Sequence, residues 1–211
     1  MDRDGGYGGY GRSGRDGRDG RDGRVGRKRS TVLVTVGTTR FDALTRAADS
    51  LSLVRLLASH GYDRLVIQIG SSETFFPSEL LGDGERTQED GTITATPLDG
   101  FQVTCFRYAP TLQDVMDEAG LVISHAGAGS IFEGLRAGKR LIAVPNRDLM
   151  DNHQADLCAH LKSSGYIEVA DVDGLEEAVV RMERRPVDLK AYEGGIPGIG
   201  EAILGDFFHH L

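Results

Sequence analysis

The stretch Leu121-Val-Ile-Ser-His-Ala-Gly-Ala-Gly-Ser-Ile-Phe-Glu133 decides the fold of this chain. Its first three residues form an apolar run that is typical of a short buried strand. A turn containing Gly127 and Gly129 follows. The apolar spacing after that turn predicts a helix that begins at about Ser130. A strand that leads through a glycine-rich turn into a helix is the unit from which open α/β sheets are built.

The same stretch predicts an anion site. The free N–H groups of the first helical turn and the positive end of the helix dipole both face the turn. Gly127 and Gly129 have no Cβ, so a phosphate can approach their backbone. Ser130 adds a hydroxyl donor, and Glu133, on the same helix face, can accept hydrogen bonds from a diol such as ribose. The residues therefore suggest a site for a nucleotide diphosphate.

A second interpretation of these residues stays open. Ser130 and Glu133 also fit a capping box, in which the two side chains satisfy backbone donors of their own helix and bind no ligand. A Gly-x-Gly turn before a helix is a weak signal for a ligand site.

Composition limits the classes of protein that the chain can belong to. Its 211 residues, 39% of them hydrophobic, fit one α/β domain with a sizeable core and a tail. The net charge is −8, of which residues 1–29 carry +4 and the remainder −12. An acidic folded domain argues against a nucleic-acid-binding body. The two cysteines, Cys105 and Cys158, form no CxxC pair, which fits a reducing compartment and argues against structural zinc.

Two regions, a tail and one domain, follow from the pattern along the chain. Residues 1–29 repeat Gly, Arg and Asp and predict a disordered tail, whereas 30–211 predict one folded domain. No apolar run approaches the ~20 residues that span a bilayer, and the N-terminus has no apolar signal region. We therefore expect a cytoplasmic protein, unless a partner holds it at a membrane.

Short apolar strands alternate with helices after the tail. The predicted strands are 31–36, 64–69, 102–106, 121–124, 140–144 and 166–169. The predicted helices are 41–59, 111–118, 130–137, 151–163 and 174–184. Residues 71–100 are polar and predict a long excursion. This alternation indicates an α/β fold with a Rossmann-like parallel sheet and helices on both faces. Ligands of such sheets bind beyond the carboxyl ends of the strands, which here means segments 37–39, 125–130 and 146–154.

The apolar spacing in Ala202–Leu211 predicts a further helix, which either assists subunit assembly or folds back on the domain.

Four motifs occur in order along the chain: Gly37-Thr-Thr39, Ser124-His-Ala-Gly-Ala-Gly-Ser-Ile-x-Glu133, Val144-Pro-Asn146 and Leu149-Met-Asp-Asn-His-Gln154. Together they resemble the donor-binding, carboxyl-terminal half of family 28 glycosyltransferases. The last motif and the Val-Ile-Ser-His-Ala-Gly stretch resemble more closely the soluble subunit of the eukaryotic UDP-N-acetylglucosamine (UDP-GlcNAc) transferase of dolichol-linked oligosaccharide assembly. The resemblance covers about residues 31–170. It does not reach the tail or the acidic loop 82–91, whose roles stay open.

The resemblance implies one half of a GT-B enzyme. A membrane-anchored second subunit supplies the acceptor half, and the reaction transfers GlcNAc with inversion from UDP-GlcNAc to GlcNAc-diphosphodolichol on the cytosolic face of the endoplasmic reticulum. It implies no covalent intermediate, no cofactor and no essential metal, because helix N-terminal amides can stabilise the leaving diphosphate.

Site residues also follow from the resemblance. Gly127, Gly129 and Ser130 line the diphosphate, and Glu133 takes the ribose hydroxyls. The remaining residues fall at the phosphate loop (Gly37, Thr38, Thr39), the uracil (Tyr108, Ala109, Leu112) and the GlcNAc hydroxyls (Asn152, His153, Gln154). His125 is the one candidate catalytic residue, although bacterial members carry Arg there, and the base that deprotonates the acceptor is not assigned.

Other interpretations of these residues remain open. His125 can equally be a buried, hydrogen-bonded histidine, and Asp151 can be a helix N-cap. His153 and His160 share a helix face, but no further ligand completes a zinc set. The function can also be that of a non-catalytic UDP-sugar-binding regulatory protein, or of an RNA-associated protein that acts through its tail.

Overall fold

The computed structural model describes residues 31–72, 78–82, 86–89, 91–146, 152–184 and 189–194, with the backbone alone at 86–89, 152 and 153. The tail 1–29, Asp151 and the segment 202–211 lie outside the described residues, so the expectations for them stay predictions. In the acidic loop 82–91, residues 83–85 and 90 also lie outside the described residues, and the backbone alone is described for the short strand 86–89.

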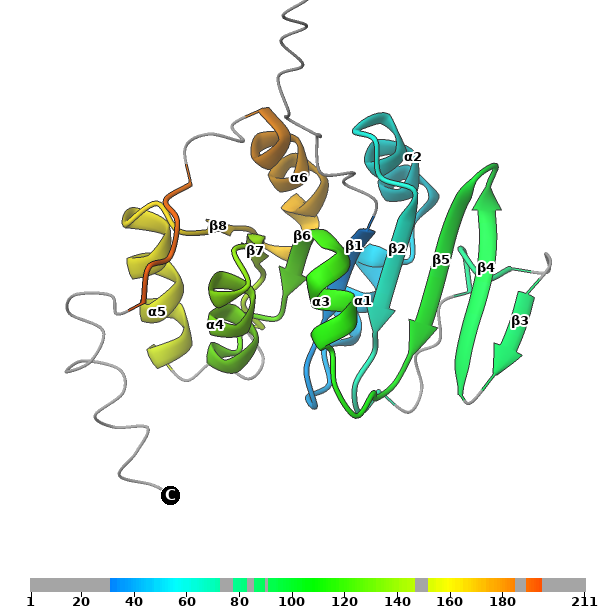
Figure 1. Cartoon of the computed structure of the whole chain (residues 1–211), viewed down its shortest axis with the longest axis horizontal. Helices are drawn as coiled ribbons and strands as arrows, with labels where there is room; N and C mark the ends of the chain where they lie inside the picture. Colours follow the sequence, from blue (N-terminus) through cyan, green and yellow to red (C-terminus); the bar gives the residue numbers. More distant parts are fainter. Residues whose placement is uncertain are drawn as a thin grey trace, which may run out of the picture.

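The described strands form one eight-stranded sheet in the order β3-β4-β5-β2-β1-β6-β7-β8 (Figure 1). Their bounds are β1 Thr31–Thr35, β2 Arg64–Gln68, β3 Arg86–Glu89, β4 Thr92–Leu98, β5 Phe101–Phe106, β6 Ala119–Ser124, β7 Arg140–Ala143 and β8 Glu168–Val169. From β5 to β8 all neighbours are parallel, whereas β3 and β4 run antiparallel to theirs. The parallel strands read as apolar runs because both faces of this part of the sheet are covered.

Helices cover both faces of the sheet, as predicted. Their bounds are α1 Asp42–Ala48, α2 Leu51–Ser59, α3 Gln113–Glu118, α4 Ala128–Arg136, α5 Asn152–Ser163 and α6 Leu175–Arg184, with a short 3₁₀ turn at Val172–Gly174. Side chains of α1, α2 and α6 pack on one face, against Val34, Ile67 and Ile123 among others. Side chains of α3, α4 and α5 pack on the other face, against Leu33, Val66 and Val122.

The second part of the long excursion predicted over 71–100 contains two strands that the sequence analysis does not predict. Strands β3 and β4 form an antiparallel hairpin that extends the parallel sheet beyond β5. Ile93 and Ala95 alternate with threonines, and both are buried, so this face of β4 adds to the core. The sheet is therefore mixed rather than wholly parallel.

The single helix predicted over 41–59 is two helices. Asp49 ends the first, and its carboxylate accepts the backbone N–H groups of residues 78–80 at 2.8, 3.1 and 2.8 Å. Ser50 then caps α2 by accepting the N–H of Leu53 at 3.5 Å. Asp49 thus joins the helix break to a loop that follows β2, a contact distant in sequence.

Candidate functional site

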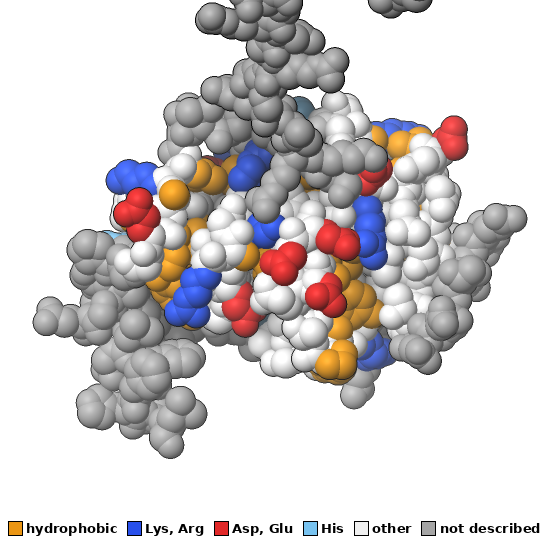
Figure 2. Space-filling view, in the orientation of Figure 1, with side chains coloured by type: hydrophobic (Ala, Val, Ile, Leu, Met, Phe, Trp, Pro, Cys, Tyr) orange, Lys and Arg blue, Asp and Glu red, His pale blue; other side chains and the backbone are white. Residues whose placement is uncertain are grey.

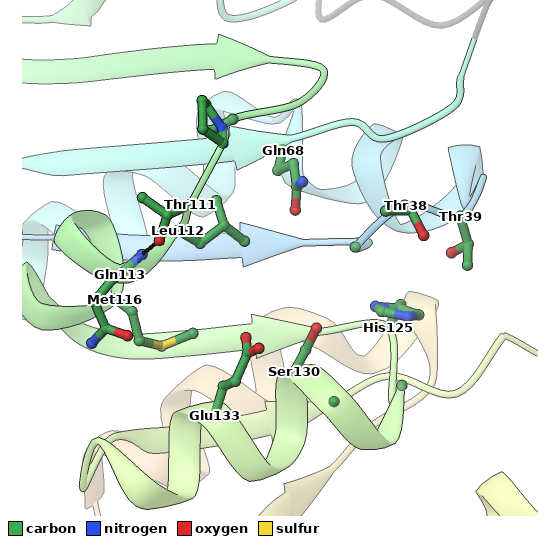
Figure 3. A pocket seen from close by; sticks show the side chains of 15 residues that line it. Thr38, Thr39, Gln68, Thr111, Leu112, Gln113, Met116, His125, Ser130 and Glu133 are labelled. Atoms are coloured by element: carbon green, nitrogen blue, oxygen red, sulfur yellow. Dashed lines mark hydrogen bonds between the residues drawn. The ribbon is translucent and has the colours of Figure 1, made fainter. Parts of the chain in front are cut away.

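A cavity of about 480 Å³ opens where the carboxyl ends of β2 and β1 meet the start of α4 (Figure 3). Register brings the strand ends together, since Thr35 of β1 pairs with Gln68 of β2 and with Ser124 of β6. Residues from the loop after β1, the end of β2, the segment around the start of α3, and the turn into α4 line the cavity. They are Gly37, Thr38, Thr39, Gln68, Ala109, Pro110, Thr111, Leu112, Gln113, Met116, His125, Gly127, Gly129, Ser130 and Glu133.

Helix α4 begins two residues earlier than predicted. Its N-cap is Gly127, with φ −65° and ψ 132°, and no side chain caps it. Ser130 is therefore the third helical residue, and the capping-box interpretation of Ser130 and Glu133 is wrong. Neither side chain has a hydrogen-bond or ion-pair partner within the described ranges, and both point into the cavity (Figure 3). The free N–H groups of the first helical turn lie at the same place.

His125 fills the space between two glycines. A Cβ on Gly127 would lie 2.4 Å from its Nε2, and a Cβ on Gly37 would lie 3.0 Å from its Cε1. Burial lowers the pKa of His125, against an opposite contribution from the backbone of Thr35. Its Nδ1 is buried and has no partner among the residues described. The imidazole is therefore neutral near pH 7 and does not act as a cation toward a phosphate.

Two features distinguish the turn between β6 and α4. Ala126 has φ 68°, the one positive φ of a non-glycine residue in the described part of the chain. Such a conformation costs of order 1–3 kcal/mol and persists only where the surroundings impose it. Gly129 differs from Gly127, because a Cβ built on it meets nothing within 4 Å. Position 127 requires glycine because a larger residue would collide with the His125 ring, whereas Gly129 leaves open space at the cavity.

Ten of the fourteen predicted donor-site residues line this cavity. Of the other four, Tyr108 and Gln154 do not. Tyr108 is 54% exposed and lies outside the lining. Asn152, His153 and Gln154 begin α5, where Gln154 is half-buried and the side chains of the first two are not described.

The structure adds lining residues that the sequence analysis missed. They are Gln68, Pro110, Thr111, Gln113 and Met116. Gln68 carried a signal, since it is the one polar side chain within the otherwise apolar run Leu65 to Ile69. Pro110 and Thr111 lie within the segment that the resemblance assigned to uracil, and Gln113 and Met116 follow it in α3. There Thr111 Oγ1 accepts the N–H of Gln113 at 3.0 Å and fixes the start of α3.

No lysine or arginine is among the described residues that line the cavity, and Glu133 makes it acidic. Acidic side chains also lie on the surface around α3 (Figure 2). An anionic ligand must therefore be bound by backbone amides and neutral donors rather than by cations.

The buried thiols lie apart from this lining. Burial raises the pKa of Cys105 to about 12 and that of Cys158 to about 11. Within the described ranges no three His, Cys, Asp or Glu side chains are grouped as metal ligands. No helix there is long and apolar enough to cross a membrane.

The family model and the related sequences point to the same protein family. Residues 31–193 match the family model of the glycosyltransferase family 28 C-terminal domain. UDP-N-acetylglucosamine transferase subunit ALG13 of Mus musculus is 38% identical over 136 residues, which are 64% of this chain and 10% of that protein. The subunit of the same name from Cryptococcus neoformans var. neoformans serotype D is 36% identical over 162 residues, 71% of this chain and 81% of that protein. The chain thus matches a tenth of the mouse protein and most of the fungal one.

Solved structures agree with the predicted fold. The solution structure of ALG13 has a TM-score of 0.63 and 26% identity, and the match covers 86% of this chain and 98% of that one. MurG of Acinetobacter baumannii, at 17% identity and a TM-score of 0.53, covers 74% of this chain and 42% of that one, and shows the fold alone. The predicted Rossmann-like half of a GT-B fold is confirmed.

Proposed function

The chain belongs to the glycosyltransferase family 28 C-terminal domain family, and on this premise we propose that it is the donor-binding subunit of a two-chain glycosyltransferase. The reaction moves GlcNAc from UDP-GlcNAc to GlcNAc-diphosphodolichol, the second step of lipid-linked oligosaccharide assembly for N-glycosylation. One observation carries the proposal: ten residues expected to hold the donor line a single cavity at the carboxyl edge of the sheet.

The cavity has the groups that a nucleotide diphosphate requires. The first-turn amides of α4 and the hydroxyl of Ser130 supply donors for the diphosphate. Glu133 has no partner of its own among the described residues, so its carboxylate is available to the ribose hydroxyls. Leu112 lies at the end of the cavity opposite Thr38 and His125 (Figure 3). We place the uracil there, beside Leu112 and its neighbour in the lining, Ala109.

We propose that a second protein subunit supplies the acceptor site. The described residues form one sheet with its helices, and the cavity lies at one edge of that sheet. The relatives from mouse and Cryptococcus are both named as subunits of a UDP-N-acetylglucosamine transferase. We place the acceptor site on a membrane-anchored partner, which recruits this chain to the cytosolic face of the endoplasmic reticulum.

The transfer is a direct displacement. An acceptor hydroxyl attacks C1 of the bound GlcNAc, the bond from C1 to the UDP oxygen breaks, and the configuration at C1 inverts. The bonding electrons leave with UDP, whose developing charge is stabilised by the amides at the start of α4. A base takes the proton of the attacking hydroxyl. The neutral imidazole of His125 is the candidate for this role on the present chain.

The test is a transfer assay with and without the membrane partner. Purified full chain is incubated with radiolabelled UDP-GlcNAc and a GlcNAc-diphosphodolichol acceptor, alone and with detergent-solubilised membranes that contain the partner. We expect donor binding in both samples and radiolabelled product only with membranes. Donor binding without product in any membrane sample would instead favour a regulatory UDP-sugar-binding protein. Robust transfer by the chain alone would contradict the two-chain proposal.

A further inference from the structure

A row of buried polar side chains crosses the sheet beneath the cavity. Gln68, Thr35 and Ser124 are the last residues of β2, β1 and β6, and they are 4%, 0% and 0% exposed. They are register partners on adjacent strands, so they lie side by side on the face covered by α3, α4 and α5. One row earlier the same face is apolar, with Val66, Leu33 and Val122 in the core. Buried polar groups are costly unless they find partners.

Only some of the hydrogen-bonding groups in this row have partners among the described residues. The Thr35 hydroxyl donates to Oε1 of Gln68 at 2.5 Å and accepts the N–H of Gly37 at 3.1 Å. Ser124 Oγ has no partner among the described residues. The Gln68 side chain points from the sheet toward Ser130 and Glu133, which point back from α4 (Figure 3). Since Oε1 is held by Thr35, the Nε2 group is the end of the Gln68 amide that has no hydrogen-bond partner among the described residues.

An anionic ligand in this cavity requires a neutral hydrogen-bond donor such as the Gln68 amide. Its lining lacks a cation in the described part of the chain. The loop after β1 offers few donors, because the Thr39 hydroxyl donates to Val36 O at 2.8 Å and its N–H to the same oxygen at 3.2 Å. The N–H of Gly37 is already bound to Thr35. A diphosphate facing this loop must therefore find neutral donors on the sheet and on α4.

We propose that Gln68 is a ligand-contacting residue of the donor site, whose Nε2 donates a hydrogen bond to a diphosphate oxygen. Thr35 is its positioning residue, because its hydroxyl fixes which end of the amide faces the ligand. The diphosphate then lies between two sets of neutral donors, Gln68 on the sheet and the first turn of α4 opposite. This inference rests on the proposed function, since it assumes a nucleoside diphosphate ligand.

The test compares UDP with uridine on the purified full chain. Gln68→Glu retains the acceptor for Thr35 but replaces the amide donor with a carboxylate that faces the diphosphate. Gln68→Met removes the donor without adding a charge, and covers the case in which the first variant does not fold. Gln102→Glu is the matched control, because Gln102 is exposed on the neighbouring strand β5 and outside the cavity lining.

We expect both Gln68 variants to bind UDP more weakly by about tenfold or more, the range for losing a hydrogen bond to a charged group. Uridine affinity, measured by NMR titration, should stay at the wild-type value, and the control should bind both ligands normally. Equal weakening for uridine and UDP, or unchanged UDP binding, would overturn the role of Gln68. If the wild-type chain binds no UDP at all, the proposed function fails as well, which separates the two failures.

Discussion

The two faces of the sheet differ at the ends of the same three strands. On the face packed by α1, α2 and α6, the last side chains of β2, β1 and β6 are the apolar Ile67, Val34 and Ile123, all 0% exposed. On the opposite face, the next residues along these strands are the polar Gln68, Thr35 and Ser124. On the first face the strand ends pack into the hydrophobic core. On the second face the strand ends carry hydrogen-bonding side chains beneath a cavity. On the proposed function, one face contributes to stability and the other contributes groups for donor binding.

The largest effect should come from the apolar face. Ile67→Ala removes a fully buried side chain, and we expect a loss of about 2–5 kcal/mol in the free energy of unfolding. Affinity for UDP should not change, since Ile67 points away from the cavity. Chemical denaturation and calorimetric UDP titration of the folded variant measure the two quantities. Weaker UDP binding by a folded Ile67→Ala chain would remove the distinction between the faces.

Glu133→Ala should give the opposite pattern. The side chain is exposed in the cavity and caps no helix, so we expect less than about 0.5 kcal/mol of lost stability, as for ordinary surface substitutions. Losing a charged acceptor for the ribose should cost about 1.5–3 kcal/mol of UDP affinity. The same two measurements decide. A lower Tm with unchanged UDP affinity would return Glu133 to a purely structural role.

Gly129→Ala should raise the stability of the fold and lower the affinity for UDP. Alanine at the second position of α4 meets no atom within 4 Å, so we expect a gain of up to about 1 kcal/mol in stability. The added methyl group occupies the space proposed for the diphosphate, so UDP affinity should fall. Gly127→Ala is the matched contrast, because its Cβ would lie 2.4 Å from His125 Nε2 and should destabilise the fold. A stabilised Gly129→Ala chain with full UDP affinity would argue against backbone approach by phosphate there.

The smallest effect is a pH dependence from His125. Burial lowers the folded pKa of His125 below the ordinary histidine value of 6.5, so the unfolded chain binds a proton at higher pH than the folded chain. This contribution to stability is complete above the unfolded pKa and is lost as the pH falls toward the folded one. Unfolding free energies between about pH 5.5 and 7.5 should therefore fall less steeply in His125→Gln than in the wild type. Parallel curves would show that the ring titrates normally.

The central strands could be predicted from the sequence. Both faces of these strands are buried, so nearly all of their residues are apolar and form continuous apolar runs. The stretch 121–133 also predicted the strand-turn-helix unit around Gly127 and contains five of the fifteen lining residues, whereas five others followed from the resemblance. The start of α4 was misplaced by two residues because Ser130 also satisfies the pattern of a helix cap. The hairpin of β3 and β4 was missed because its residues are polar, although Ile93 and Ala95 alternate in the manner of a half-buried strand.

Contacts between distant residues could not be predicted. The break between α1 and α2 depends on Asp49 binding the backbone of residues 78–80, which no local pattern reveals. The position of Gln68 in the cavity likewise depends on the register of β2 with β1 and on the hydroxyl of Thr35. The ring of His125 lies between Gly37 and Gly127, so it brings together two loops whose residues 37 and 125 are 88 positions apart along the chain. Such contacts place the site, and only the folded structure contains them.

The most direct test of the donor-site account is an NMR titration of the isotope-labelled full chain with UDP-GlcNAc. We predict saturable amide shifts at Gly129 and Ser130 and at the side-chain amide of Gln68, with little change at Val34 and Ile67 on the apolar face. A folded chain whose spectrum does not change at millimolar UDP-GlcNAc, or whose shifts map away from this cavity, would contradict the account.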